Sequence, residues 1–231
     1  MTEPKLDFLI ASAQRTGSGL LCELLRQSAK VGRVGEFLNP PQLNKQIAET
    51  GHGMRDVVLN RIAEASNGYA RAVKLHYPAF RNLLDEFSVN ELFPDKVVLV
   101  SRRDRLAQAI SLAKARATGS FSSDAMSDVV PRYDYLRIST ALKQIRDQDA
   151  QWRTLCSVMK VRPFEVVYED LVSDPAGSVT SVLEYLGIEL DRLPEIAKAR
   201  RKVQRDGVNE DWRARFASDY RSAELREPAQ G

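Results

Sequence analysis

Four short apolar runs divide the chain, and each is followed by a polar loop and then by a helical pattern of apolar residues. The runs cover Phe8 to Ala13, Ala70 to Leu75, Val97 to Ser101 and Phe164 to Tyr168. Strands that are apolar throughout are typical of parallel sheets, because helices cover both of their faces. The repeated order of strand and helix therefore predicts an α/β fold with a central, mostly parallel sheet flanked by helices.

Two of the helical patterns are regular enough to place their bounds. Residues 104–117, DRLAQAISLAKARA, are rich in strong helix formers, and Asp104 is a suitable N-cap for them. The longest pattern covers residues 135–159, where apolar side chains recur at helical spacings. This spacing predicts one buried stripe that is made of Ile138, Leu142, Ile145, Trp152, Cys156 and Met159.

The length and the composition of the chain fit a single domain of this class. It has 231 residues, of which 43% are hydrophobic and 28% are charged, and this is enough to build a sizeable core. No internal repeat and no interdomain linker is evident. We therefore expect one domain over residues 1–231, in which residues 213–231 form a C-terminal helix and tail.

The charge balance and the cysteine content restrict the classes of partner and compartment. The formal net charge is +3, which does not by itself indicate nucleic acid, and there is no polybasic tail. No apolar run approaches membrane-spanning length, and the first residues lack the pattern of a secretory signal peptide. The two cysteines, Cys22 and Cys156, fall in helical patterns and predict no disulfide framework. We expect a cytoplasmic protein without a membrane span and without a nucleic-acid partner.

The loop after the first apolar run carries the clearest signal of a binding site. It reads QRTGSG over residues 14–19 and leads into the helical pattern LLCELLRQSA. The first N–H groups of a helix have no partner inside it, and the helix dipole is positive there, so an anion is favoured. Arg15 adds a full charge that suits a phosphate or sulfate, and Gly17 and Gly19 allow the backbone to approach a ligand closely. We interpret the loop as an anion site, although strand–Gly–helix turns also occur without a ligand.

The same loop resembles a Walker A motif but lacks its diagnostic end. In that motif the last glycine is followed by Lys and then by Ser or Thr, whereas here Gly19 is followed by Leu20. No lysine is in place to reach a β- or γ-phosphate, and Ser18 does not stand in the context that holds magnesium. These departures argue against ATP or GTP hydrolysis. A P-loop-like nucleotide-binding module without turnover, or a kinase-like phosphotransferase, remains the alternative.

A second basic cluster follows the third predicted strand, in the stretch VVLVSRRDRLAQAIS over residues 97–111. Arg102 and Arg103 emerge at the carboxyl end of that strand, where ligands bind in open α/β sheets. Ser111 lies eight residues beyond Arg103 on the following helix, so a second anionic group can sit between them. Alternatively, both arginines pair with surface acids such as Asp104. Two anion sites one nucleoside apart suggest a nucleotide that is phosphorylated at both ends.

Several stretches together resemble the sulfotransferases, and more closely the bacterial trehalose 2-sulfotransferase family. In chain order they are ASAQRTGSGLL, GEFL at 35–38, AVKLH at 72–76, SRRDRLAQAIS, VVYEDLVSDP at 166–175, and the segment up to Trp212 with RARF behind it. The resemblance implies a P-loop-like sulfotransferase fold and an enzyme that uses 3′-phosphoadenosine 5′-phosphosulfate (PAPS) as its sulfuryl donor. It implies that the acceptor is a carbohydrate hydroxyl, on trehalose, another sugar or a glycolipid, and that the protein forms a homodimer.

The resemblance also assigns donor contacts residue by residue. The loop around the 5′-phosphosulfate would consist of Gln14, Arg15, Thr16, Gly17, Ser18 and Gly19. Arg102 or Arg103 would hold the 3′-phosphate together with Ser111, and the spacing leaves open which arginine does so. Gln204 and Trp212 would belong to a segment that closes over the nucleotide.

The catalytic groups follow from the same resemblance and from the chemistry of sulfuryl transfer. Arg15 would neutralise the charge that develops on the bridging oxygen as the nucleotide leaves. Glu36 stands where the family has its catalytic glutamate and is the expected base for the acceptor hydroxyl, with His76 as the rival. Lys74 either reaches a phosphate or faces solvent. Two histidines and two cysteines without ligand spacing predict no metal site.

Overall fold

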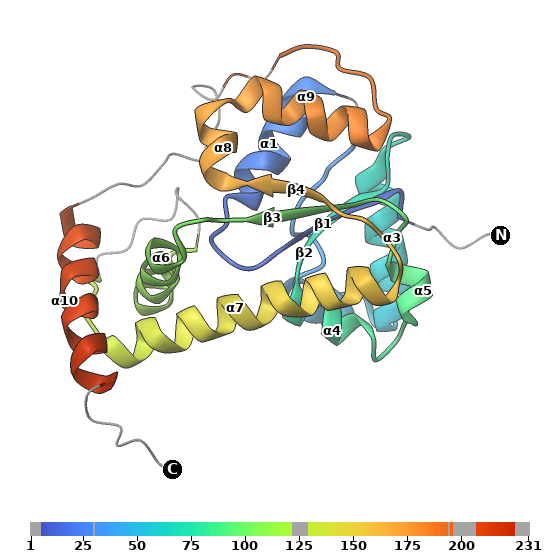
Figure 1. The fold of residues 1–231 in the computed structure, drawn as a ribbon. Coiled ribbons are helices and arrows are strands. Elements are labelled where there is room, and N and C mark those ends of the chain that lie inside the picture. The colour runs from blue at the N-terminus through green and yellow to red at the C-terminus, as the bar shows by residue number, and fades with distance from the viewer. Residues whose placement is uncertain (1–5, 30, 122–128, 194, 196–206, 225–231) are drawn as a thin grey trace. The chain divides into compact units, whose positions relative to one another are not determined.

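The computed structural model describes residues 6–29, 31–121, 129–193, 195 and 207–224, and it contains the predicted parallel sheet (Figure 1). The strands are β1 (Phe8–Ser12), β2 (Ala72–His76), β3 (Val97–Ser101) and β4 (Phe164–Val167). Their order across the sheet is β2-β1-β3-β4, and every neighbouring pair is parallel. All four predicted strands are confirmed, with ends that differ by at most two residues from the predicted ones.

The sheet lies between two layers of helices, and each layer has its own apolar core. On one face, Phe8, Ile10 and Val98 pack against α1 (Ser18–Ser28) and α9 (Pro175–Leu186). On the other face, Leu9 and Leu99 pack against α3 (Met54–Ser66), α4 (Tyr77–Leu83) and the second half of α7 (Tyr135–Val158). Alternate residues of a strand point to opposite faces, so an uninterrupted apolar strand supplies both cores.

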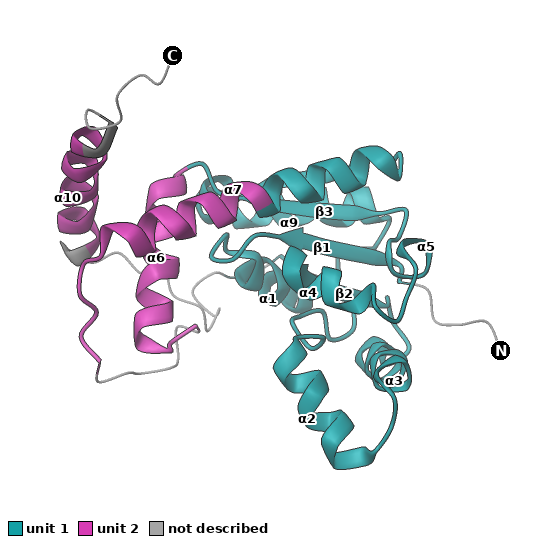
Figure 2. Ribbon diagram, turned by 90° about the horizontal axis from the view of Figure 1, so that it is seen from below, with its two compact units in different colours: residues 1–103, 148–199 teal, residues 104–147, 200–231 magenta. Residues whose placement is uncertain are grey.

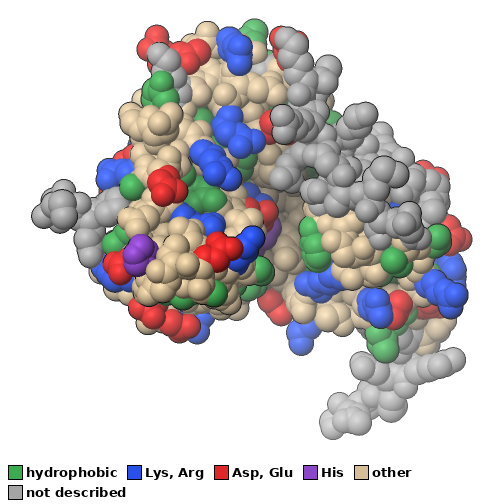
Figure 3. Space-filling model, turned by 180° about the vertical axis from the view of Figure 1, so that it is seen from behind, with side chains coloured by type: hydrophobic (Ala, Val, Ile, Leu, Met, Phe, Trp, Pro, Cys, Tyr) green, Lys and Arg blue, Asp and Glu red, His purple; other side chains and the backbone are tan. Residues whose placement is uncertain are grey.

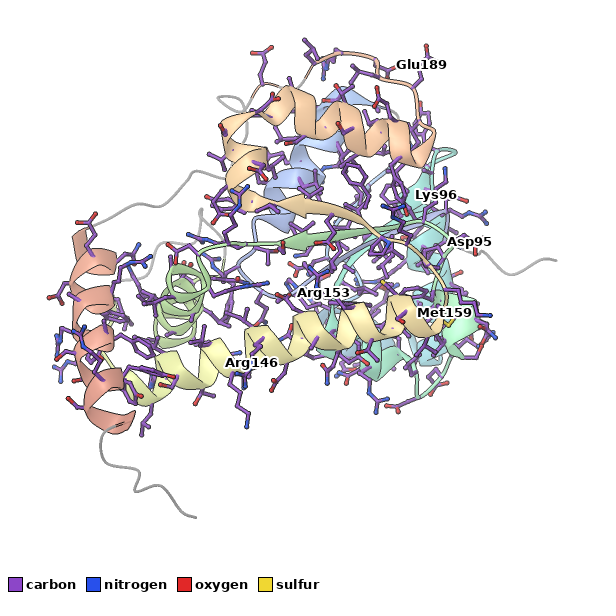
Figure 4. All side chains as sticks on the ribbon, in the orientation of Figure 1. Asp95, Lys96, Arg146, Arg153, Met159 and Glu189 are labelled. Carbon is purple, nitrogen blue, oxygen red and sulfur yellow. The ribbon has the colours of Figure 1, made fainter. Side chains whose placement is uncertain are left out.

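Shorter helices complete the connections between the strands. Between β1 and β2 lies α2 (Pro40–Thr50), and between β2 and β3 lies α5 (Val89–Leu92). After β4 the chain enters α8 (Tyr168–Ser173) directly and then α9. Residues labelled in Figure 4 make two polar contacts. Lys96 Nζ donates to the carbonyl oxygen of Leu186, at the end of α9, over 2.5 Å. Arg153 of α7 pairs bidentately with Glu165 of β4 at 2.6 and 2.8 Å.

The chain divides into two compact units, residues 1–103 with 148–199 and residues 104–147 with 200–231 (Figure 2). The first unit contains the whole sheet. The second contains α6 (Arg105–Thr118), the first half of α7 and α10 (Gly207–Glu224), which includes the beginning of the expected C-terminal helix and tail. The expectation of one domain over residues 1–231, and that of a homodimer, stay predictions.

Both helices whose bounds the sequence placed are present. In α6 the Asp104 carboxylate accepts a hydrogen bond from the Ala107 N–H over 2.9 Å, which confirms the predicted N-cap. Helix α7 matches the predicted range, and Ile138, Ile145, Trp152 and Cys156 of its stripe are buried. None of the helices within the described ranges is long and apolar enough to cross a membrane.

Charges of both signs lie on the face drawn in Figure 3, where Lys and Arg side chains and Asp and Glu side chains are each spread over several places. The presence of both signs agrees with the small net charge of the chain.

Trp152 joins α7 to the carboxyl end of β1. Its side chain is fully buried, with ring centroids of Tyr77 and Phe80 at 5.1 and 5.2 Å. Its indole N–H donates to the Ser12 carbonyl oxygen over 3.1 Å. Because Ser12 is the last residue of β1, this bond fixes the point at which the strand becomes a loop.

We expect Trp152→Ala to lower the free energy of unfolding by about 3–5 kcal/mol, because it opens a large cavity in the core and removes the bond to Ser12. Urea denaturation measures the loss. Val158→Ala is the matched control on the same helix, because the Val158 side chain is 71% exposed, and its effect should stay within about 0.5 kcal/mol. Equal effects of the two changes would contradict the assignment of Trp152 to the core.

Candidate active site

The loop between β1 and α1 is a tight turn. Thr16 is buried, and its hydroxyl donates to the Ala13 carbonyl oxygen over 3.2 Å. Arg15 and Gly17 have left-handed backbones, with φ of 62° and 79°. For a residue other than glycine this conformation is uncommon and costs about 1–3 kcal/mol, and such outliers gather at functional sites. The surrounding structure therefore holds Arg15 in a costly conformation.

The turn leads directly into the first residues of α1. Gly17 is the N-cap, and Ser18 and Gly19 are the first two helical residues, so the sequence-predicted anion loop coincides with a helix N-terminus. The first bond of the helix runs from the Leu21 N–H to the Gly17 carbonyl oxygen over 3.1 Å. Gln14 stands at the other end of the turn, just before Arg15.

The structure explains why residue 17 is a glycine, which the sequence alone did not. A Cβ atom at this position would lie 2.3 Å from Cδ2 of Tyr168, the first residue of α8. The aromatic ring thus occupies the space that a side chain would need, and the left-handed backbone independently favours glycine. The sequence interpretation attributed this glycine to a close approach of a ligand; packing against Tyr168 is enough to require it.

The two arginines after β3 have different surroundings. The Arg102 guanidinium lies over the Tyr168 ring, 4.8 Å from its centroid, and the side chain is 21% exposed. Arg103 is 59% exposed and pairs with Asp170 on α8, while its backbone N–H donates to Glu169 over 3.0 Å. Both arginines thus pair with acids of α8, the alternative considered from the sequence, since Arg102 Nε also lies 3.8 Å from Glu169 Oε1.

Other predicted donor contacts belong to the second unit or lie outside the described residues. Ser111 is on α6, and Trp212 is on α10, where it is buried with its ring 5.9 Å from that of Tyr133. Asp104, the acid suggested as a partner for the arginines after β3, pairs instead with Arg213 of α10. Gln204 lies outside the described residues.

The predicted base and its rival form one cluster with a lysine. Glu36 lies in the loop before α2, and its Oε1 is 2.5 Å from Lys74 Nζ and 2.6 Å from His76 Nε2. The exposed fractions of the side chains are 29% for Glu36, 14% for His76 and 5% for Lys74. Lys74 therefore does not face solvent. It is buried and forms an ion pair with Glu36, the predicted base.

The cluster shifts the pKa values of its members. Burial alone would raise the pKa of Glu36, but the hydrogen bond from His76 and the charge of Lys74 outweigh it and hold that pKa well below its usual range. Burial, and after it the Lys74 charge, lowers the pKa of His76 against the opposing effect of Glu36. At neutral pH the arrangement thus holds an ionised carboxylate beside a neutral imidazole.

Two backbone contacts hold the Glu36 segment in place. The Lys74 N–H donates to the Gly35 carbonyl oxygen over 3.0 Å, so the loop runs along the edge strand β2. On the other side, Arg61 of α3 donates to the Phe37 carbonyl oxygen over 2.5 Å and also to the Gln42 side chain over 3.3 Å. The carboxylate is thus attached to a segment that is clamped between a strand and a helix.

Sequence reasoning missed how Lys74, Arg61 and Tyr168 contribute. Lys74 and His76 are two residues apart on a strand, so their side chains lie on the same face of the sheet. This spacing could have predicted that the two side chains are neighbours. No comparable local signal marks Arg61 or Tyr168, whose contacts join segments that are distant in the chain. Within the part of the chain that the structure describes, no three or more His, Cys, Asp or Glu side chains are grouped to hold a metal ion.

We expect the free energy of unfolding to fall as the pH is lowered from 7.5 to 5.5. Because the pKa of His76 in the folded protein lies below its ordinary value of 6.5, the unfolded chain binds more protons in this range, and stability rises with pH. The slope from one group is at most about 1.4 kcal/mol per pH unit.

His76→Gln removes this group and should flatten the pH dependence, as urea denaturation at several pH values measures. His52→Gln is the control, because the exposed His52 lies outside the cluster, and it should keep the wild-type profile. A wild-type slope in His76→Gln would show that His76 does not cause it.

Comparisons with known proteins identify the family and the fold. The family model described as Stf0 sulphotransferase matches residues 69–219. Nodulation protein H of Rhizobium meliloti is 27% identical over 215 residues, covering 88% of this chain and 86% of its own. Among solved structures, a sulfotransferase from Alicyclobacillus acidocaldarius has a TM-score of 0.51 at 16% identity, covering 94% of this chain and 93% of its own.

A sulfotransferase domain from the curacin biosynthetic pathway has the same TM-score of 0.51, with 14% identity and coverage of 91% of this chain and 83% of its own. At such identities the two structures support the fold, which is the P-loop-like α/β fold of sulfotransferases. The family model extends over well more than half of the chain and includes Lys74, His76 and the arginines after β3. Fold and family model thus agree, and the protein belongs to the Stf0 sulphotransferase family of sulfuryl-transferring enzymes.

Proposed function

We propose that the protein transfers a sulfuryl group from PAPS to a hydroxyl of a carbohydrate, on trehalose, another sugar or a glycolipid, without a metal ion. The observation that carries this proposal is the Glu36–Lys74–His76 cluster, which lies next to the anion loop because His76 Nδ1 contacts Ser12. A base for an acceptor and a loop for an anionic donor then lie at the same edge of the sheet, where ligands of α/β folds bind.

The donor is proposed to bind with its 5′-phosphosulfate on residues 14–19. The N-terminus of α1 and the Arg15 side chain favour an anion there. Of the two arginines after β3, we favour Arg103 for the 3′-phosphate. An exposed ion pair such as Arg103–Asp170 contributes little to stability, so its guanidinium can exchange to a phosphate, whereas Arg102 is held on Tyr168.

In the proposed reaction the acceptor oxygen bonds to sulfur while the bond from sulfur to the oxygen of the nucleotide phosphate breaks. Glu36 accepts the acceptor proton, because it is ionised and is the most exposed member of the cluster. Arg15 stabilises the charge on the departing phosphate oxygen. Positioning and charge stabilisation account for most of the catalysis, as in loose phosphoryl transfer.

Titration of 3′-phosphoadenosine 5′-phosphate (PAP) in a calorimeter tests the donor. We expect PAP to bind more tightly than ATP or AMP, because only PAP carries phosphate at both ends of the nucleoside. Arg15→Ala should weaken PAP binding by about 10- to 100-fold, the loss expected when a charged hydrogen-bond donor is removed. Equal affinity for ATP and PAP would instead favour a nucleotide-binding module or a kinase-like enzyme.

Glu36→Gln tests the base. With sugar acceptors and PAPS, turnover should fall about 10²- to 10⁴-fold, because the variant cannot accept a proton. PAP affinity should change little. Glu91→Gln is a matched control and should keep turnover. Glu91 pairs with Arg55, at a distance of 2.5 Å, and is not part of the loop or the cluster. If Glu36→Gln retained turnover and His76→Gln lost it, His76 would be the base.

A further inference from the structure

A chain of hydrogen bonds joins the proposed base to the anion loop. Glu36 Oε1 contacts His76 Nε2 at 2.6 Å, His76 Nδ1 lies 3.2 Å from Ser12 Oγ, and Ser12 Oγ lies 3.1 Å from Ser18 Oγ. Ser12 is fully buried and Ser18 is 3% exposed. The two hydrogen bonds between His76 and the loop, through Ser12 and Ser18, are therefore shielded from water. The direction of each one depends on the direction of the other.

The Ser12 hydroxyl can face this chain in two ways. It carries one proton, so it donates either to Ser18 Oγ or to His76 Nδ1, and it accepts from the other partner only if that partner carries a proton. The indole N–H of Trp152 binds the Ser12 backbone carbonyl oxygen over 3.1 Å. The backbone of Ser12 is thus fixed while its hydroxyl proton is free to turn.

The protonation of His76 decides which way the hydroxyl turns. The imidazole faces two charged groups among the described residues, the Glu36 carboxylate at 2.6 Å and the Lys74 ammonium at 3.4 Å, both on the Nε2 side. An ionised Glu36 requires a proton on Nε2 at that distance. A neutral ring then has no proton on Nδ1, and Ser12 must donate to it. A charged ring donates from Nδ1 to the Ser12 carbonyl oxygen at 3.1 Å, and Ser12 can donate to Ser18.

We propose that the Ser12 hydroxyl couples the binding of a nucleotide phosphate at residues 14–19 to the uptake of a proton by His76 Nδ1. A Ser18 hydroxyl that donates to a bound phosphate can only accept from Ser12. Ser12 then turns its own hydroxyl proton toward Ser18. His76 Nδ1 is left without a hydrogen-bond donor and takes up a proton from solvent. The site thus gains a positive charge beside Glu36 only when the donor is bound. This inference rests on the proposed function, because it takes the loop ligand to be the phosphate end of the donor nucleotide.

Calorimetric titration of PAP at pH 7, in two phosphate-free buffers of different ionisation enthalpy, measures the protons taken up on binding. We expect the wild type to take up more than Ser12→Ala, by up to about one proton per PAP. The difference between variants is decisive, because the phosphates of PAP themselves titrate near neutral pH. Ser12→Ala should still bind PAP, since Ser12 is buried beneath the loop.

Nitrogen-15 NMR of the histidine rings gives a readout that needs no turnover, because the chain has two histidines. PAP should move the His76 signals toward the doubly protonated ring in the wild type but not in Ser12→Ala or Ser18→Ala. Ser28→Ala is the matched control, a fully buried serine at the far end of α1, and it should behave like the wild type.

The outcomes separate the two proposals. If PAP fails to bind the wild type, both the proposed donor and the proposed coupling are wrong. If PAP binds but the protonation of His76 does not change, the coupling is wrong while the proposed function stands. If Ser12→Ala takes up protons as the wild type does, Ser12 does not carry the coupling.

Discussion

The ion pair between Lys74 and Glu36 is the interaction on which the candidate site depends. A lysine on a strand of an α/β sheet is costly to bury unless an anion pairs with it, and Lys74 on the edge strand β2 is only 5% exposed. The loop before α2 must therefore place a carboxylate, that of Glu36, beside Lys74. Its attachment to β2 through Gly35 and to α3 through Arg61 does so. In return, the lysine and His76 hold the pKa of the Glu36 carboxyl low and keep it ionised, as the proposed role of a base requires.

The parallel sheet explains why the proposed base and the proposed anion loop are neighbours. All four strands run in the same direction, so their carboxyl ends meet at one edge. Ser12 ends β1, His76 ends β2 and Tyr168 follows β4. The pairing of β1 with β2 places Ser12 opposite His76, and this register creates the link between loop and cluster. A slip of one residue would turn His76 to the other face.

Much of the fold and part of the site could be predicted. The four strands, the N-cap at Asp104 and the long helix after residue 134 follow from local patterns that the structure confirms. The predicted transition from the loop over residues 14–19 to a helix is confirmed, while its binding of an anion stays a prediction. The pairing of Lys74 with Glu36, the ring that requires Gly17, and the acids that hold Arg103 could not be predicted, because each joins segments that are far apart in the chain.

The sequence by itself determined the order of strands and helices, the QRTGSG turn and the presence of a glutamate, a lysine and a histidine in two short motifs. These features depend on local periodicity and on backbone preferences, which neighbouring residues carry. Only the tertiary structure decided which charges meet and which are buried. The pKa values of Glu36 and His76 follow from that arrangement, because desolvation and Coulomb interactions act through space and not along the chain.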